Sequence, residues 1–114
     1  MNRRRKGAEW EEKAAQYLIS RGYSIVQMNY RCRLGEIDII AKDSGYYVFA
    51  EVKYRSSKEY GSPLEAVTPM KRQKIKRAAS FYLMEHGISM YVKCRFDVIG
   101  ILGSEITLIK DAFW

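Results

Sequence analysis

The stretch GEIDIIAKDSGYYVFAEVKYR, residues 35–55, decides the fold of this chain. Two runs rich in β-branched and aromatic residues, EIDIIAK and YYVFAEVKYR, are separated by the turn signal DSG. This pattern predicts two antiparallel strands, 36–42 and 46–55, joined by a tight turn at Ser44 and Gly45. Charged residues at the ends of these runs need an explanation, because charge beside a buried strand is costly.

The turn at Ser44 and Gly45 fixes the register of this hairpin. Asp43 would pair with Tyr46, and equal steps back along both strands place Asp38 opposite Glu51. Directly opposed residues share a face of the sheet, with β-carbons about 4.5–5.5 Å apart, and alternation adds Lys53 to that face. A longer turn or a bulge would shift the register by one residue, so convergence of the three side chains is an expectation that the structure must test.

Outward from the hairpin, hydrophobic periodicity predicts the remaining elements. We expect a helix over 7–21, a strand over 23–31, a helix that starts at Thr68 and Pro69 and ends at Gly87, and two strands, 90–101 and 105–113, about a turn at Gly103 and Ser104. The apolar side of the second helix is predicted to comprise Met70, Ile75, Ala78, Ala79, Tyr82 and Leu83.

The fold class expected from this order is α/β, with a central mixed five-stranded sheet flanked by helices in the order α-β-β-β-α-β-β. A long helix separates the third strand from the fourth, so these two strands should be parallel. A length of 114 residues suits one domain, 1–114, and residues 1–6 are expected to form a flexible basic arm.

Composition indicates a folded, cytoplasmic protein with an anionic partner. The chain is 47% hydrophobic and 29% charged, and no apolar run approaches the roughly 20 residues that a membrane span needs. Cys32 and Cys94 lack metal-ligand spacing, which favours a reducing compartment. The formal net charge of +7 favours nucleic acid as the partner and no membrane.

The predicted cluster of Asp38, Glu51 and Lys53 suits metal-dependent chemistry. Two carboxylates this close repel, and a divalent cation relieves the repulsion. Mg²⁺, with Mn²⁺ as a substitute, would be held by Asp38 and Glu51, and Lys53 would stabilise charge on a phosphate. The chemistry this describes is phosphodiester hydrolysis. The alternative is that these charges are only the solvated ends of a hairpin.

The same residues carry a family resemblance. Asp38, Glu51 and Lys53 resemble the PD-(D/E)xK signature of restriction-endonuclease-like nucleases. The segments GEIDIIA, VFAEVKYRSS, YGSPLEAV and RFDVIGI resemble the YraN-like family of small, largely uncharacterised bacterial proteins regarded as endonucleases. The core layout also resembles that of archaeal Holliday-junction resolvases. The resemblance implies a restriction-endonuclease-like fold, and it implies that Glu11, in WEEKAA, contributes a catalytic carboxylate.

The chain departs from the family pattern at a few positions. Ile37 stands where the signature has proline, which is not a ligand, and Trp10 stands where members of the family often have glycine. Glu11 is flanked closely by other glutamates and could equally be an exposed acid near a helix start. We expect Glu36 to support either the structure or, from behind, the residues of the site, and Asp97 to pair with Arg95 or a loop.

The sequence therefore predicts a Mg²⁺-dependent endodeoxyribonuclease that selects DNA structure, such as branched DNA, and not sequence. Backbone contacts that position the nucleic acid are expected from Arg31, Arg33, Arg55, Lys71, Arg72 and Lys74. A non-catalytic nucleic-acid-binding module on a nuclease fold is the alternative, and a structural adaptor is a weaker one. A homodimer is suggested only by analogy with resolvases.

Overall fold

The computed structural model describes residues 3–55 and 62–113, with side chains from residue 7 onwards. The elements follow the predicted order, with one short 3-10 helix, η2, added before the second α-helix: α1 Arg3–Ser20, β1 Ser24–Cys32, β2 Gly35–Asp43, β3 Tyr46–Arg55, η2 Pro63–Ala66, α2 Pro69–Glu85, β4 Cys94–Leu102 and β5 Glu105–Ile109. Of the helices in these ranges, none has the length and apolar character needed to span a membrane.

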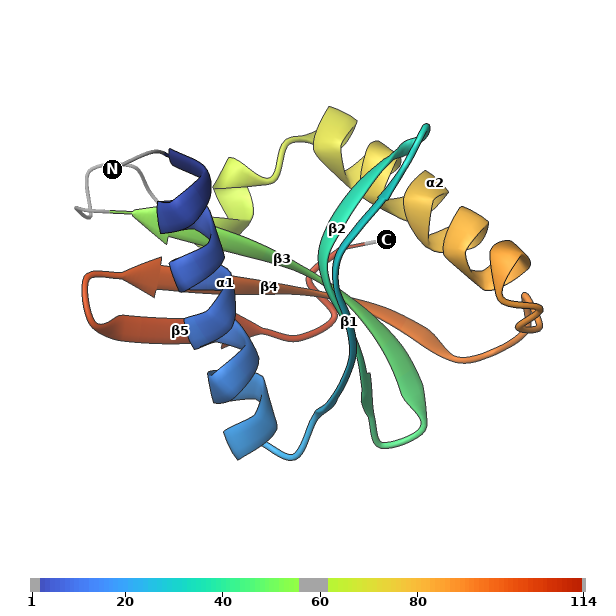
Figure 1. Cartoon of the computed structure of the whole chain (residues 1–114), viewed down its shortest axis with the longest axis horizontal. Helices are drawn as coiled ribbons and strands as arrows, with labels where there is room; N and C mark the ends of the chain where they lie inside the picture. The colour runs from blue at the N-terminus through green and yellow to red at the C-terminus, as the bar shows by residue number, and fades with distance from the viewer. Residues whose placement is uncertain (1–2, 56–61, 114) are drawn as a thin grey trace.

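The strands form one mixed sheet in the order β1-β2-β3-β4-β5. Neighbours are antiparallel except β3 and β4, which are parallel. The chain reaches β4 from β3 through α2, so the predicted crossover is confirmed. The α/β class and the five-stranded sheet flanked by helices are confirmed as well (Figure 1).

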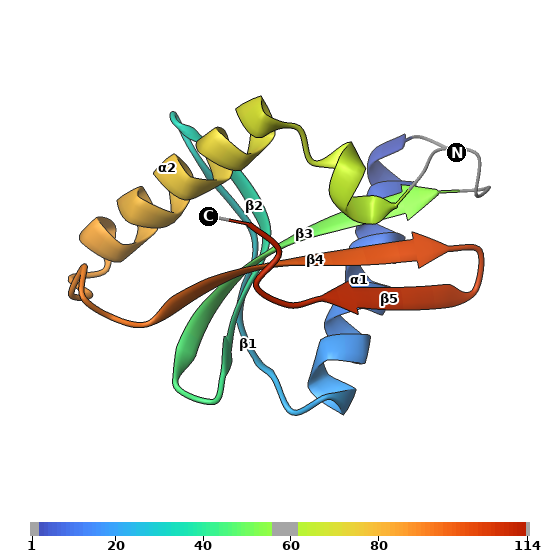
Figure 2. The same ribbon diagram turned by 180° about the vertical axis from the view of Figure 1, so that it is seen from behind.

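The two helices pack against different hydrophobic clusters of the sheet. In α1, Ala14 and Leu18 belong to the cluster that contains Ile39, whereas Ile75 and Tyr82 of α2 belong to the one that contains Phe49. Seen from opposite sides, α1 lies in front of the sheet in Figure 1 and behind it in Figure 2. Residues of either helix can therefore reach charged side chains of the sheet.

Helix α2 confirms most of the predicted apolar side. Its N-cap is Thr68, whose side chain accepts a hydrogen bond from the Lys71 backbone N–H, and Pro69 follows in the first turn. The buried residues match the prediction except for Met70, which is 71% exposed. Met70 was wrongly included because it lies five positions before Ile75, which places the two side chains about 140° apart around the helix.

Some element ends differ from the prediction. Helix α1 begins at Arg3, so part of the segment expected to be an arm has helical backbone; residues 1–2 lie outside the described residues. Strand β4 starts at Cys94 and not at 90. Strand β5 ends at Ile109 because Asp111, at φ 52°, turns the chain back toward β4, where the Ala112 N–H donates to the Phe96 carbonyl at 2.7 Å.

A buried polar network secures this C-terminal turn. The carboxylate of Asp97 is fully buried and accepts hydrogen bonds from the Tyr23 hydroxyl, the Arg95 guanidinium and the Asp111 N–H at 2.8–3.0 Å. Arg95 also pairs with Asp43 at 2.9 Å, and these carboxylates raise the pKa of Arg95 above its ordinary value. The expected pairing of Asp97 with Arg95 is confirmed, and the network is fully hydrogen-bonded, as a buried charge requires.

Candidate functional site

The β2–β3 hairpin has the predicted register until the strands separate. Asp43 pairs with Tyr46, and the ladder continues to Ile39 opposite Ala50. Beyond that pair, the Asp38 side chain contacts β3 in place of the backbone ladder. Its Oδ2 accepts a hydrogen bond from the Val52 backbone N–H at 2.8 Å. The carboxylate therefore satisfies a donor freed where the backbone ladder stops, and this holds Asp38 against β3.

The structure brings Asp38, Glu51 and Lys53 together. The Asp38 carboxylate lies close enough to Glu51 to raise the pKa of Glu51, and Lys53 Nζ lies 3.4 Å from Glu51 Oε1. Burial, followed by the charge of Asp38, raises the pKa of Glu51 to about 7, and burial also raises the pKa of Asp38. Two carboxylates this close repel each other, and a cation bound beside them would relieve that repulsion.

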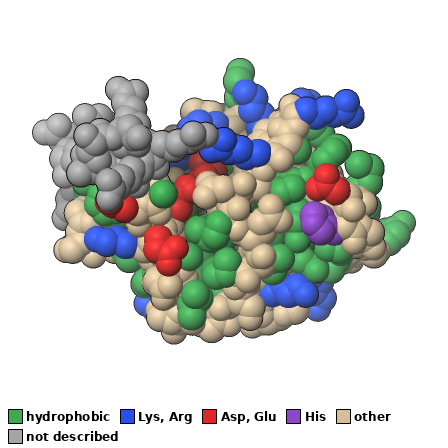
Figure 3. Space-filling view, viewed as in Figure 1, with side chains coloured by type: hydrophobic (Ala, Val, Ile, Leu, Met, Phe, Trp, Pro, Cys, Tyr) green, Lys and Arg blue, Asp and Glu red, His purple; other side chains and the backbone are tan. Residues whose placement is uncertain are grey.

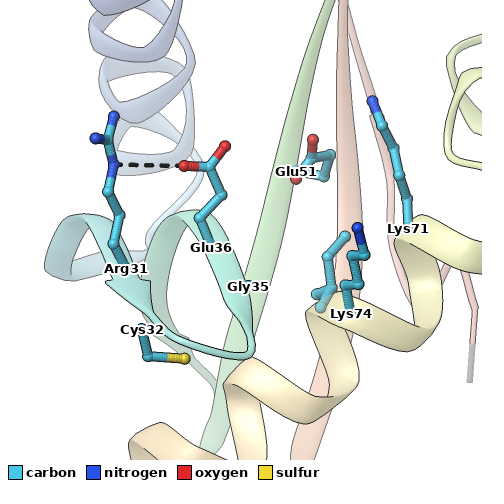
Figure 4. A pocket seen from close by; sticks show the side chains of 8 residues that line it. Arg31, Cys32, Gly35, Glu36, Glu51, Lys71 and Lys74 are labelled. Atoms are coloured by element: carbon cyan, nitrogen blue, oxygen red, sulfur yellow. Dashed lines mark ion pairs between the residues drawn. The ribbon is translucent and has the colours of Figure 1, made fainter.

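Glu51 faces a cavity of about 450 Å³ between the β1–β2 turn and α2. Lys71 and Lys74 line it from α2, and Arg31 and Glu36 line it from β1 and β2 (Figure 4). The nearby Lys53 ammonium and burial lower the pKa of Lys71. The Glu51 carboxylate therefore has the ammonium groups of Lys53 and Lys71 beside it. The excess positive charge can attract a second anion.

Gly35 allows the β1–β2 turn to approach α2 this closely. A Cβ at this position would stand 3.0 Å from the Lys74 carbonyl oxygen, and the backbone has φ +156°. A side chain here would push the turn and the helix apart and would widen the cavity.

Glu11, on α1, lies near the carboxylates of Asp38 and Glu36. The preceding residue, Trp10, stacks on Tyr54 of β3 with ring centroids 3.9 Å apart, which fixes this part of α1 over the sheet. Burial and the charge of Asp38 are the main causes that raise the pKa of Glu11 to about 6. Figure 3 shows acidic side chains gathered on the surface between the two helices, with basic ones nearby.

The remaining basic residues predicted to contact nucleic acid lie in different places. Arg31 lines the cavity and forms an exposed ion pair with Glu36 at 3.4 Å. Arg33 lines a separate groove on the outer side of α2, and Arg55 is half-buried at the end of β3. Arg72 donates to the Val67 and Leu64 carbonyls, so its guanidinium holds η2 against the start of α2.

Sequence reasoning missed two contributors to this site. Glu36 was expected to support the structure or to support the site from behind, yet it lines the cavity itself, and its charge adds to burial in raising the pKa of Asp38. Residues two apart on a strand share a face, so the spacing itself could have shown this. Asn29 was not considered. It lies between the pairs Met28–Ile39 and Tyr30–Ile37, and so across from Asp38, and its side chain opposes the rise in the pKa of Glu11.

The donor set suits a hard divalent cation that keeps part of its water shell. Among the described residues, no three His, Cys, Asp or Glu side chains converge closely enough to hold a metal ion alone. Mg²⁺ needs only one or two protein carboxylates, with water and phosphate oxygens completing its shell. Asp38 and Glu51 are adjacent, and Glu11 Oε1 is buried without a hydrogen-bond partner in the described structure. The residues present therefore fit such an ion.

The raised pKa of Glu51 predicts a pH-dependent stability. Because the folded-state pKa is about 7 against an ordinary 4.5, the protonated group stabilises the fold below pH 4.5, and this stabilisation is lost as pH rises through 7. In EDTA, the free energy of unfolding of wild type should fall by about 2 kcal/mol more than that of Glu51→Gln between pH 4.5 and 8. Denaturant titrations of both proteins measure this difference, and parallel profiles would contradict it.

The chain matches a known protein family over most of its length. The model of the uncharacterised protein family UPF0102 matches residues 10–101. A UPF0102 protein of Lachnoclostridium phytofermentans is 50% identical over 113 residues, which cover 99% of this chain and 96% of the relative. A UPF0102 protein of Syntrophus aciditrophicus is 48% identical, with 96% and 88% covered. The chain therefore belongs to the UPF0102 family, which is the YraN-like family that its sequence segments resemble.

Proposed function

We propose that this protein is a metal-dependent endonuclease that hydrolyses phosphodiester bonds in DNA in the cytoplasm. The observation that carries the proposal is the meeting of the Asp38 and Glu51 carboxylates with the Lys53 and Lys71 ammonium groups beside one cavity. Acids that bind a cation and lysines that bind a phosphate are the parts that phosphodiester hydrolysis needs. The resemblance to restriction-endonuclease-like nucleases and the net charge of +7 support the same reaction.

Each residue has a distinct task in the proposed reaction. A bound Mg²⁺ would polarise the phosphoryl oxygen and lower the pKa of a water molecule. Asp38 and Glu51 would hold the ion through their carboxylates, and the Val52 N–H keeps Asp38 oriented. Lys53 and Lys71 would neutralise charge that grows on the phosphate in the transition state, and Lys74 would hold phosphate at the same cavity.

Structure-selective binding follows from the distribution of basic groups. Lysine and arginine contacts to phosphates position a nucleic acid without reading its bases. The cavity-lining cations come from a strand and a helix, and both described α-helices pack on the sheet, so no element resembles a helix that projects into a DNA groove. We therefore propose selection of branched or otherwise distorted DNA, with weak dependence on sequence.

A purified-protein assay tests this function. Labelled single-stranded, duplex, flapped and four-way-junction DNA would be incubated with Mg²⁺, Mn²⁺ or EDTA at pH 8, above the raised pKa of Glu51, which is about 7. We expect cleavage with either metal ion, at least about tenfold faster on branched DNA than on duplex, and none in EDTA. Sequencing of the cut ends should show no fixed base context.

A non-catalytic binding module is the second candidate. It is favoured by the lack of a three-ligand metal cluster among the described residues. In that case the protein would bind the same DNA in a salt-dependent way, with log Kd changing linearly with log salt concentration, but would cleave none of it with any metal ion. Neither binding nor cleavage would refute both candidates.

A further inference from the structure

A groove of about 700 Å³ lies between the β1–β2 turn, at residues 33–34, and the face of α2 that runs from Gln73 to Met84. We call it the α2 groove. Its helical residues recur at spacings of three and four, as residues on one face of a helix do. This face is about 16 Å long, or three helical turns. The α2 groove shares no lining residue with the cavity that Glu51 faces, so it is a separate surface.

The α2 groove has an apolar lining that is open to solvent. Leu34, Phe81, Met84 and Met90 line it, and the leucine and the two methionines are 38%, 64% and 60% exposed. Apolar side chains gathered on an exposed surface mark an interaction site, and methionine adapts its shape to varied apolar partners. Phe81 packs partly against the core, whereas stacked bases need exposed aromatic faces. The lining therefore suits aliphatic side chains better than nucleic-acid bases.

The charged residues of the α2 groove are all basic. They are Arg33, Lys76 and Arg77, and no acidic side chain lines the groove. Within residues 7–55 and 62–113, none of these three cations forms an ion pair. Cations beside an apolar surface complement a partner that presents carboxylates beside apolar groups. The concave shape favours a narrow partner over a flat membrane surface.

We propose that the α2 groove binds an acidic amphipathic helix of a partner protein. Three turns of such a helix match the length of the α2 face, and its apolar residues at i, i+3 or i+4, and i+7 would cover Met84 and its apolar neighbours. Its carboxylates would pair with Lys76 and Arg77. A second copy of this chain fits less well, because each copy carries a net charge of +7. The inference goes beyond the proposed nuclease activity, since the groove is separate from the catalytic cavity.

A designed peptide tests this chemistry. The probe is a fluorescein-labelled peptide of about 18 residues, because shorter helices are marginal in water. It contains glutamate and alanine, with leucines at every third or fourth position along one face. A second peptide has the same composition, with its leucines spread around the helix. By fluorescence anisotropy in EDTA, the first peptide should bind with a Kd of about 10–100 µM, and the second at least about tenfold more weakly.

Met84→Ser and Arg77→Glu should each weaken binding of the first peptide about tenfold or more. The first substitution removes an apolar contact and the second reverses a charge. Both side chains are exposed, so the melting temperatures should stay within about 3 °C of wild type. Met70→Ser changes an exposed methionine of α2 outside the groove, and Lys42→Glu reverses an exposed charge near the far end of β2. These two controls should keep the affinity within about twofold of wild type.

The proposal is wrong if the two peptides bind equally, if neither binds at about 1 mM protein, or if Met84→Ser and Arg77→Glu retain wild-type affinity. A loss of single-stranded DNA binding, or of binding to vesicles of phosphatidylglycerol and phosphatidylcholine, in Met84→Ser but not in Met70→Ser would assign the groove to that ligand instead. A dimer that dissociates in Met84→Ser, measured by sedimentation, would assign it to a second copy. None of these readouts requires a metal ion or DNA cleavage, so each result leaves the proposed nuclease activity to its own assay.

Discussion

Asp38→Asn and Glu51→Gln should each reduce Mg²⁺-dependent DNA cleavage by at least about 1000-fold. Both substitutions keep the shape of the side chain and remove the charge that would hold the cation. A metal ion contributes several kcal/mol to transition-state stabilisation, and about 4 kcal/mol corresponds to three powers of ten in rate. Initial cleavage rates on a four-way junction at pH 8, with excess enzyme, measure the loss.

DNA binding should respond in the opposite direction to cleavage. Removal of a carboxylate from a cavity lined by Lys71, Lys74 and Arg31 lowers the repulsion felt by phosphate, so each variant should bind DNA in EDTA at least as tightly as wild type. Glu105→Gln, which removes an exposed acid from β5, is the control and should retain wild-type cleavage. Cleavage that persists in both site variants would locate the activity elsewhere or in a contaminant.

Asp97→Ala should produce the largest loss of stability, about 3–5 kcal/mol. The substitution leaves the half-buried Arg95 with one carboxylate fewer, and it removes the acceptor for the Tyr23 hydroxyl and the Asp111 N–H. Removal of one partner from a buried ion pair is far more damaging than the pair itself is stabilising, because the other charge stays in the interior. Denaturant unfolding at pH 7 measures this free energy.

The exposed pair Arg31 and Glu36 provides the comparison. It also joins an arginine to a carboxylate, at 3.4 Å, but both side chains are at least 60% exposed. Glu36→Gln should therefore change the unfolding free energy by less than about 1 kcal/mol. Equal effects at positions 36 and 97 would show that burial does not control the strength of these pairs.

Local features of the sequence predicted much of the fold. The turn at Ser44 and Gly45 sets the hairpin register, since a two-residue turn leaves one pairing and strand alternation then fixes each face. Thr68 starts α2 because a side-chain cap satisfies a free backbone donor within the same segment. Errors concentrate where the hydrophobic pattern is ambiguous, as for Met70, or where a single residue such as Asp111 ends a strand.

The candidate site could be predicted only in part. Asp38, Glu51 and Lys53 belong to one hairpin, so their meeting follows from local register. Lys71 was expected to touch a phosphate backbone farther away, and the structure places it against Lys53. Arg72, its neighbour in sequence, turns instead toward the Val67 carbonyl. Nothing in the order of these basic residues distinguishes one from the other.

The sequence by itself determined the elements, their order and the acidic hairpin with its lysine, because these depend on interactions between residues close together in the chain. The tertiary structure alone decided that Lys71 of α2 lies beside that hairpin, and it placed Glu11 of α1, which only the family resemblance had suggested, near Asp38. The choice depends on how far each helix is rotated about its axis and where it crosses the sheet. Those quantities are set by packing between residues distant in sequence, such as Tyr82 against Phe49 and Trp10 against Tyr54.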